Sequence, residues 1–283
     1  MSERIWRCRD HAFELGARTL VMGVLNVTPD SFSDGGLYAD AAAAVAHGAR
    51  MADDGADIVD VGGESTRPGA APVAVDEELQ RVLPVIKGLR ASRPDLVVSI
   101  DTRHSRVAKE AVAAGASIVN DISGALDPAM ADVVKDAGTG LVLMHMQGDP
   151  RTMQVAPHYD DVVAEVHEFL RERVESAVFA GIASEYLCVD PGIGFGKDLE
   201  HNLALLRAVE RFADLDAAVM VGASRKQFIG ALTEVEDPAA RVEGSIAAAV
   251  LSVGHGADAV RVHDVAETVR ALRVADAIVR DGA

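Results

Sequence analysis

One pattern recurs along this 283-residue chain and constrains its fold more than any other feature. A short apolar run ends in a polar residue, a glycine-containing loop follows, and a helical segment comes next. The clearest copy starts with the apolar run Tyr186–Val189, continues through Asp190 and the glycine-rich turn up to Lys197, and leads into a helix. The pattern occurs about eight times, as expected for a ring of parallel strands whose C-terminal ends face one pocket. The sequence therefore predicts an α/β fold, a single (β/α)8 TIM barrel.

The expected elements follow from this pattern. Strands are predicted at Thr19–Leu25, Asp57–Val61, Leu96–Ile100, Ser117–Val119, Gly140–Met144, Tyr186–Val189, Ala217–Val221 and Ala257–Val260. Helices are predicted at Ala39–Asp54, Asp76–Leu89, Arg106–Ala114, Met130–Ala137, Tyr159–Ala180, Leu199–Phe212, Ala239–Val253 and Val265–Arg280. Gly55, Gly115 and Gly256 each stand where a helix should end, the position at which a left-handed glycine is common. A doubly wound open sheet is the alternative.

The length and composition favour one domain. A barrel of this type typically has about 250 residues, and no linker divides the chain, so one domain is expected over residues 1–283. Residues 1–18 should form an N-terminal β-hairpin, with its turn near Glu14–Gly16, that plugs the bottom of the barrel. Apolar residues make up 49% of the chain and aromatic residues only 4%, which suits helix-covered parallel strands.

Several functions are disfavoured by composition. The net charge of −17 argues against a nucleic-acid partner, since such proteins are usually basic. No apolar run reaches the roughly 18 residues that a membrane helix needs, and the charged N-terminus does not resemble a signal peptide. We therefore expect a cytoplasmic protein without a membrane partner. Cys8 and Cys188 lack metal-ligand spacing, and no P-loop or zinc motif occurs.

Polar residues at the predicted strand ends indicate a binding pocket. They are Asn26, Thr66, Arg67, Asp101, Asn120, His145, Asp190, Ser224, Lys226, Arg261 and His263. Carboxylates and an amide among them can bind the N–H groups of a flat heterocycle, and a 2-amino-pyrimidinone edge suits a carboxylate that accepts two bonds.

Two further groups of residues suggest an anion and its counterion. Arg261 and His263 alternate along one strand, so both can face a phosphate or pyrophosphate, although an ion pair is the alternative for Arg261. Asn26 offers the neutral oxygen that Mg²⁺ accepts when phosphates supply its other ligands. Ser224-Arg225-Lys226 opens a helix and could bind an anion, with Lys226 directed inward and Arg225 outward.

The loops after the first two strands contain glycine and proline together with Asp30, Asp34, Thr66 and Arg67. Such loops at the mouth of a pocket are candidate lids. Ordinary solvated connections are the alternative.

Long sequence runs resemble the bacterial dihydropteroate synthase family from Leu20 to His263. The matching runs are Gly23–Gly36, Gly62–Gly69, Ser99–Thr102, Asn120–Gly124, Met144–Gly148, Asp190–Lys197, Ser224–Lys226 and Arg261–His263. The resemblance implies a transferase that condenses 6-hydroxymethyl-7,8-dihydropterin pyrophosphate with p-aminobenzoate. The products are dihydropteroate and pyrophosphate. It also implies Mg²⁺, a dissociative substitution and a homodimer.

The resemblance further implies roles for individual residues. It assigns Asp34, Arg67, Asp101 and Lys226 to catalysis, Asn26 to the metal, and Thr66, Pro68, Asp101, Asn120, Asp190, Phe195, Gly222, Ser224, Lys226, Arg261 and His263 to substrate binding. Sulfonamides should then compete with p-aminobenzoate. A methyltetrahydrofolate-dependent methyltransferase and an inactive pterin-binding protein are the alternatives. The first has no need of the Ser224–Lys226 run or of the Arg261 and His263 pair, and the second has no need of Asn26, Asp34 and Arg67.

Overall fold

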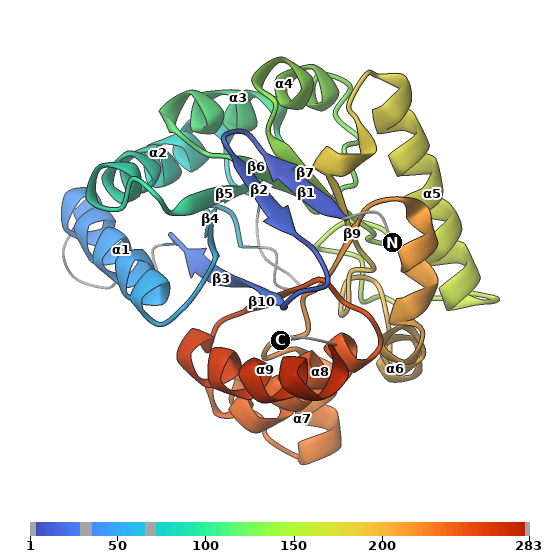
Figure 1. The fold of residues 1–283 in the computed structure, drawn as a ribbon. Helices are drawn as coiled ribbons and strands as arrows, with labels where there is room; N and C mark the ends of the chain where they lie inside the picture. Colours follow the sequence, from blue (N-terminus) through green and yellow to red (C-terminus); the bar gives the residue numbers. More distant parts are fainter. Residues whose placement is uncertain (1–3, 29–35, 66–71, 281–283) are drawn as a thin grey trace.

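The strands form the barrel that the repeated pattern predicts. The computed structural model describes residues 4–28, 36–65 and 72–280, without the side chains of residues 36–40. Within these ranges, eight parallel strands close in the order β10-β3-β4-β5-β6-β7-β8-β9 (Figure 1). Their bounds are β3 Leu20–Asn26, β4 Ile58–Gly62, β5 Val97–Asp101, β6 Ile118–Asp121, β7 Gly140–Met144, β8 Leu187–Asp190, β9 Ala218–Val221 and β10 Ala259–Val262. Because β10 pairs with β3, the sheet has no open edge and the open-sheet alternative is wrong.

Helices surround the barrel and cover the outer face of its strands (Figure 1). They are α1 Gly36–Asp53, α2 Val75–Ser92, α3 Ser105–Ala114, α4 Met130–Ala137, α5 Val162–Phe179, α6 Leu199–Arg207, α7 Gln227–Thr233, α8 Val242–Gly254 and α9 Val265–Val279. Short 3-10 turns lie at Ser184–Tyr186, Val209–Leu215 and Pro238–Ala240. After α3, Gly115 adopts a left-handed conformation with φ of 117°, as the sequence predicts for a helix end.

Most observed element boundaries lie within three residues of the predicted ones. Three helical segments show what causes such differences. The helix predicted at Leu199–Phe212 divides into α6 and the 3-10 turn Val209–Leu215. The helix predicted from Tyr159 begins only at Val162, since Asp161 caps it by accepting from the backbone N–H groups of Val163 and Ala164. The helix predicted from Ala239 begins at Val242, after a 3-10 turn that starts at Pro238.

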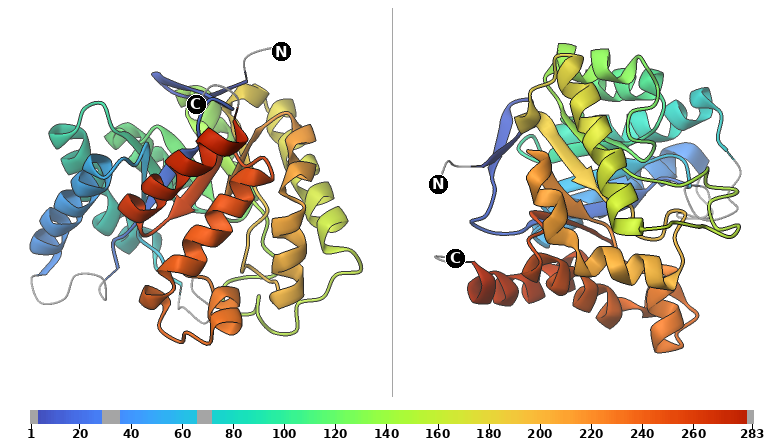
Figure 2. Two further views of the ribbon diagram at one scale, coloured as in Figure 1. Left: turned by 60° about the horizontal axis from the view of Figure 1, so that its bottom comes forward. Right: turned by 90° about the vertical axis from the view of Figure 1, so that its right-hand side faces the viewer.

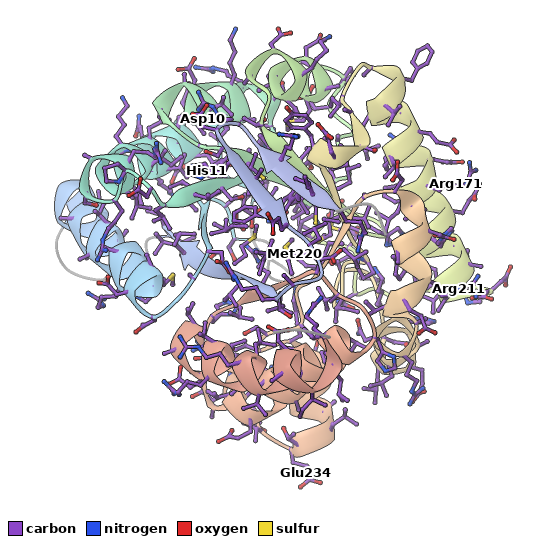
Figure 3. The ribbon with its side chains drawn as sticks, viewed as in Figure 1. Asp10, His11, Arg171, Arg211, Met220 and Glu234 are labelled. Carbon is purple, nitrogen blue, oxygen red and sulfur yellow. The ribbon has the colours of Figure 1, made fainter. Side chains whose placement is uncertain are left out.

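The strand register divides the core into two regions. Val59 and Val61 face the helices in the main hydrophobic cluster, whereas Ile58 faces the barrel interior. Because side chains alternate along a strand, Asp60 shares the inward face with Ile58. The inner cluster contains the apolar side chains near the strand beginnings, including Met22, Ile58, Val97, Ile118, Val142, Cys188, Met220 and Ala259. Figure 3 shows Met220 near the barrel axis.

The N-terminal hairpin covers this apolar end of the barrel. β1 (Ile5–Cys8) and β2 (His11–Glu14) pair antiparallel, and Figure 2 shows them across the barrel end opposite the loops that follow the strands. Trp6 and Cys8 are fully buried within the inner cluster. The turn lies at Arg9–Asp10, not near Glu14–Gly16, because Arg9 adopts a left-handed φ of 57° and reverses the chain there. Asp10 and His11 mark this turn in Figure 3.

Candidate active site

The inward-facing positions become polar towards the strand C-termini. Beyond the inner apolar layer, β5 ends with Asp101, β6 carries Asn120 and β8 ends with Asp190. A cleft of about 1860 Å³ opens at this end of the barrel and extends over neighbouring helices. Of the predicted site residues, it is lined by Asn26, Asp101, Phe195, Gly222, Ser224, Lys226, Arg261 and His263. Alternation along parallel strands therefore places one layer of polar side chains directly above an apolar one.

Arg261 is held between two carboxylates. Its Nε donates to Asp60 Oδ2 and its Nη2 to Asp101 Oδ2, both at 2.7 Å. The ion pair named as the alternative for Arg261 is thus present, while the residue also lines the cleft. Burial raises the pKa of Asp101 to about 7, against the lowering effect of the Arg261 charge. Asp101 can therefore change its protonation state near neutral pH when a ligand or neighbouring charge changes.

Asp60 also orients the amide of Asn120. Asn120 Nδ2 donates to Asp60 Oδ2 at 2.9 Å, and both side chains are almost fully buried. Because an ionised carboxylate only accepts hydrogen bonds, this contact defines which end of the amide is the nitrogen. Sequence reasoning missed Asp60. Its one signal is an aspartate between Val59 and Val61 in an apolar strand, where a buried charge requires partners.

Asp190 lies deeper in the site, 4% exposed. Its Oδ1 accepts the backbone N–H of Gly192 at 2.7 Å. Its Oδ2 faces Gly222, where a Cβ atom would lie 3.5 Å from that oxygen. Burial raises the pKa of Asp190, although the Gly192 hydrogen bond and the charge of Lys226 oppose the shift. The missing side chain at Gly222 leaves room beside an acceptor that can meet the N–H groups of a ligand.

Lys226 lies across from this acid, and Arg225 points away. The Nζ of Lys226 stands 3.9 Å from the ring centroid of Phe195, in cation–π contact. Burial lowers the pKa of Lys226 to about 8, and the positive charge of Arg261 acts in the same direction. Arg225 pairs with Asp264 through two hydrogen bonds of 3.1 and 2.5 Å. Lys226 thus contacts the ring of Phe195 at the wall of the cleft, while Arg225 is held by Asp264.

His263 follows β10 and contacts Ser224. Ser224 Oγ accepts the His263 backbone N–H at 3.2 Å and lies 3.1 Å from its Nδ1. Burial lowers the pKa of His263 to about 3, and the charge of Arg261 adds to the effect. The ring is therefore neutral near pH 7. If the serine hydroxyl donates to Nδ1, the ring presents Nε2–H as a hydrogen-bond donor.

Asn26 is the candidate metal ligand. It ends β3, lines the cleft, and its Oδ1 lies 3.7 Å from where a Cβ on Gly62 would stand. Asp101 Oδ2 lies equally far from that same point. Within residues 4–28, 36–65 and 72–280, no group of three or more His, Cys, Asp or Glu side chains could hold a metal ion. This donor set suits a Mg²⁺ ion that takes most of its ligands from substrate phosphates and water.

The remaining predicted residues divide into two groups. Asp34, Thr66, Arg67 and Pro68 lie outside the described residues, as do Asp30 and, within the matching run Gly23–Gly36, Phe32. His145 is described, but it is 7% exposed and its ring lies 2.9 Å from the ammonium of Lys197. Lys197 received no role from the sequence, although it belongs to the Asp190–Lys197 run and is almost fully buried.

The chain is similar to known proteins over most of its length. The family model described as pterin binding enzyme matches residues 22–263. The dihydropteroate synthase of Escherichia coli strain K12 is 50% identical over 257 residues, which is 91% of this chain and 90% of the relative.

Solved structures agree with this match. A Xanthomonas albilineans dihydropteroate synthase with 4-aminobenzoic acid superposes with a TM-score of 0.92 and 50% identity, covering 98% of each chain. A second structure of the Xanthomonas albilineans enzyme, in complex with 7,8-dihydropteroate, has a TM-score of 0.87 and 47% identity. It covers 97% of this chain and 98% of that one.

Proposed function

Because the chain belongs to the family of pterin-binding enzymes, and within it to the dihydropteroate synthases, we propose how its cleft carries out that reaction. The enzyme condenses 6-hydroxymethyl-7,8-dihydropterin pyrophosphate with p-aminobenzoate and releases 7,8-dihydropteroate and pyrophosphate. We assign these roles because two sets of side chains, hydrogen-bond acceptors and cations, lie together in one cleft. Buried acceptors, Asp101, Asn120 and Asp190, adjoin the cationic Lys226 and Arg261.

The acceptors suit the pterin ring. Asp190 keeps one oxygen free of the Gly192 contact and directed towards the space at Gly222, where ring and amino N–H groups can reach it. Asn120 is oriented by Asp60 and can offer its amide oxygen to the same ligand. Two N–H bonds to a buried carboxylate are charge-assisted and specific in geometry. A pterin without its pyrophosphate should therefore still bind.

The cations suit the leaving group. Among the described residues, Arg261 Nη1 has no hydrogen-bond partner, and this nitrogen can donate to pyrophosphate together with His263. In the reaction the bond between the pterin methylene carbon and the pyrophosphate oxygen breaks, and its electron pair leaves with pyrophosphate. The amine nitrogen of p-aminobenzoate then forms a bond to that carbon and loses a proton. The nearby carboxylates stabilise the cationic methylene carbon, and Arg261 stabilises the departing anion.

The second substrate should bind at the wall formed by Phe195 and Ser224. Phe195 is 7% exposed and packs with Ile122, Met144 and Met153, so its ring offers a fixed apolar surface to an aromatic acid. Thr66, Arg67 and Pro68, which the family resemblance adds to this site, stay predictions because they lie outside the described residues. Asp34 stays a prediction for the same reason.

We also propose a dependence on Mg²⁺. When bound, the ion would neutralise negative charge on the leaving pyrophosphate. Asn26 would hold it through its amide oxygen, beside Asp101. Calorimetric titration of Mg²⁺ into protein with pyrophosphate, compared for wild type and Asn26→Ala, measures this contribution without turnover. A variant that binds the ion as well as wild type would contradict the assignment.

A homodimer is proposed on the basis of the helical surface. Leu251 of α8 and Val274 and Ile278 of α9 are 64%, 61% and 78% exposed, and these two helices lie side by side (Figure 1). Exposed apolar side chains on adjacent helices are typical of an interface. Light scattering should show a dimer that Ile278→Asp dissociates, whereas a monomeric wild type would refute the proposal.

The cytoplasm is the proposed location. Both cysteines, Cys8 and Cys188, are buried free thiols, as is usual for proteins of a reducing compartment. None of the described helices is long and apolar enough to cross a membrane. Cell fractionation tests the location directly.

One assay tests the main proposal. Purified protein is incubated with pterin pyrophosphate, p-aminobenzoate and Mg²⁺, and the product is identified by mass spectrometry. Dihydropteroate and pyrophosphate in equal amounts are expected. Pterin binding without product would instead favour the inactive pterin-binding alternative. Methyl transfer in a parallel incubation with methyltetrahydrofolate and a methyl acceptor would favour the methyltransferase.

A further inference from the structure

Lys197 is a buried amine that the mechanism above does not use. It is 2% exposed. Its Nζ donates to the backbone oxygen of Phe195 at 2.9 Å and to that of His145 at 3.4 Å, and it lies 2.9 Å from His145 Nδ1. These three contacts match the three hydrogens of an ammonium group. Burial lowers the pKa of Lys197 to about 7, so the charged form is costly to hold at this position.

The contacts of Lys197 join two turns of the barrel. His145 follows β7, and its backbone N–H donates to the Asp190 backbone oxygen at the end of β8 at 3.1 Å. A Cβ on Gly192 would lie 1.9 Å from the His145 oxygen, and a Cβ on Gly196 would lie 2.6 Å from the Gln147 oxygen. The two turns therefore pack backbone against backbone, with Lys197 binding oxygen atoms on both sides.

The turn held in this way packs against Lys226. Phe195 lies in this turn, and its ring centroid is 3.9 Å from the Lys226 Nζ. The preceding Gly194 has a left-handed φ of 82°, and a Cβ there would come 3.0 Å from Lys226 Cδ. A small shift of the turn would move both the ring and the glycine surface against which the lysine stem packs.

We propose that Lys197 is a positioning residue for pterin binding, which holds the Gly192–Gly196 turn so that Phe195 and Gly194 place Lys226 beside Asp190. The inference rests on the proposed function only in taking the pocket of Asp190 and Lys226 as the pterin site. Lys197 lies at the edge of the cleft, and its Nζ is engaged by the two turns. It acts through the Phe195 backbone, and its removal leaves two backbone oxygens without their donor.

Lys197→Met gives the first test, since methionine keeps the length of the chain and removes the donors. The dissociation constant for 6-hydroxymethylpterin is measured by calorimetry, together with the melting temperature. We expect pterin affinity to fall at least fivefold while the melting temperature stays within a few degrees or rises, because a buried ammonium is also removed. Lys109→Met, on an exposed position of α3, is the matched control and should change neither quantity.

A purely structural role predicts a different result. It would lower the melting temperature of Lys197→Met and leave pterin affinity unchanged in the folded protein, and this outcome overturns the proposal. If Lys197→Met does not fold, Lys197→Leu, which also lacks any donor, is judged by the same two criteria. If wild type binds no pterin at all, the proposed function fails, which is distinct from equal binding by wild type and variant.

A double-mutant cycle tests whether the effect passes through Phe195. Pterin affinity is measured for Phe195→Leu, Lys197→Met and the double variant. Since both substitutions disturb the same contact with Lys226, the double variant should bind within about twofold of Phe195→Leu alone, as coupled residues do. Additive losses would show that Lys197 acts by another route and would overturn the inference.

Discussion

Replacing Glu78 by glutamine should reveal a buried carboxylate that limits the stability of the barrel above neutral pH. Glu78 lies in the first turn of α2 and is 1% exposed, and a hydrogen bond from the Thr102 side chain lowers its pKa only in part against this burial. Burial is the main cause that raises its pKa from 4.5 to about 7, and the charge of Glu64 acts in the same direction. The folded protein thus keeps a proton that the unfolded chain releases at lower pH.

The sign and size of the effect follow from this difference in pKa. Because the folded-state pKa is the higher one, the stability linked to Glu78 is fully present below pH 4.5 and is lost as the pH rises through about 7. One pKa unit corresponds to about 1.4 kcal/mol, so the wild type should lose roughly 3 kcal/mol in total. Glutamine keeps the shape without titrating. The gain in stability from Glu78→Gln should therefore be about 2–3 kcal/mol larger near pH 8 than near pH 5.

Urea denaturation followed by circular dichroism at the two pH values measures the free energies of unfolding. The same substitution at Glu172, an exposed position of α5, is the control and should stay within about 0.5 kcal/mol of wild type. Taking the difference between variant and wild type at each pH cancels the titration of other buried groups. A Glu78→Gln effect that is equal at both pH values would refute the argument.

Three further predictions concern activity. Asp190→Asn should weaken pterin binding by about 1–3 kcal/mol and p-aminobenzoate binding less, because the amide places a donor against ring N–H groups; unchanged pterin affinity in calorimetry would contradict the assignment of Asp190. Chelation of Mg²⁺ should abolish turnover while bare pterin binding persists, and full activity in excess chelator would rule out the metal. Sulfonamides should compete with p-aminobenzoate. Phe32→Leu and Pro68→Ser should change the inhibition constant of the drug and the Michaelis constant of the substrate by different factors, since the drug carries extra volume towards the pocket mouth. Non-competitive kinetics would show that this geometry is wrong.

The fold was predictable because its signal is repeated. Each strand is a short apolar run with a polar end, and a misplaced boundary in one unit does not alter the topology of eight. The hairpin was harder, since its turn contains no glycine or proline. It is made instead by Arg9 in a left-handed conformation, which an arginine seldom adopts. The sequence near Glu14–Gly16 offered a more ordinary turn signal, and Gly16 does have a left-handed φ of 95°.

Site residues that end a strand were predictable from the sequence. Residues that lie within a strand, or that are buried between loops, were not. Asp101, Asn120 and Asp190 stand at predicted strand ends, so topology alone places them together. Asp60 lies within a strand, and nothing in the sequence indicates that its partners come from Asn120 and Arg261, 60 and 201 residues away. Lys197 was equally hard to predict. Its burial depends on how closely the turns after β7 and β8 approach each other, which the sequence does not indicate.

The pairing of charges explains how a chain with a net charge of −17 can receive an anionic substrate. Asp60 and Asp101 share Arg261, and the charge of Lys226 opposes the rise that burial causes in the pKa of Asp190, so the acids of the cleft already face cations. Asp101 and Lys226 have pKa values of about 7 and about 8. Each can therefore change its protonation state near neutral pH when the charge beside it changes. The reaction forms a cation on the pterin and releases pyrophosphate as an anion. It therefore needs a site in which positive and negative side chains are nearly balanced and are held in place before the bond breaks.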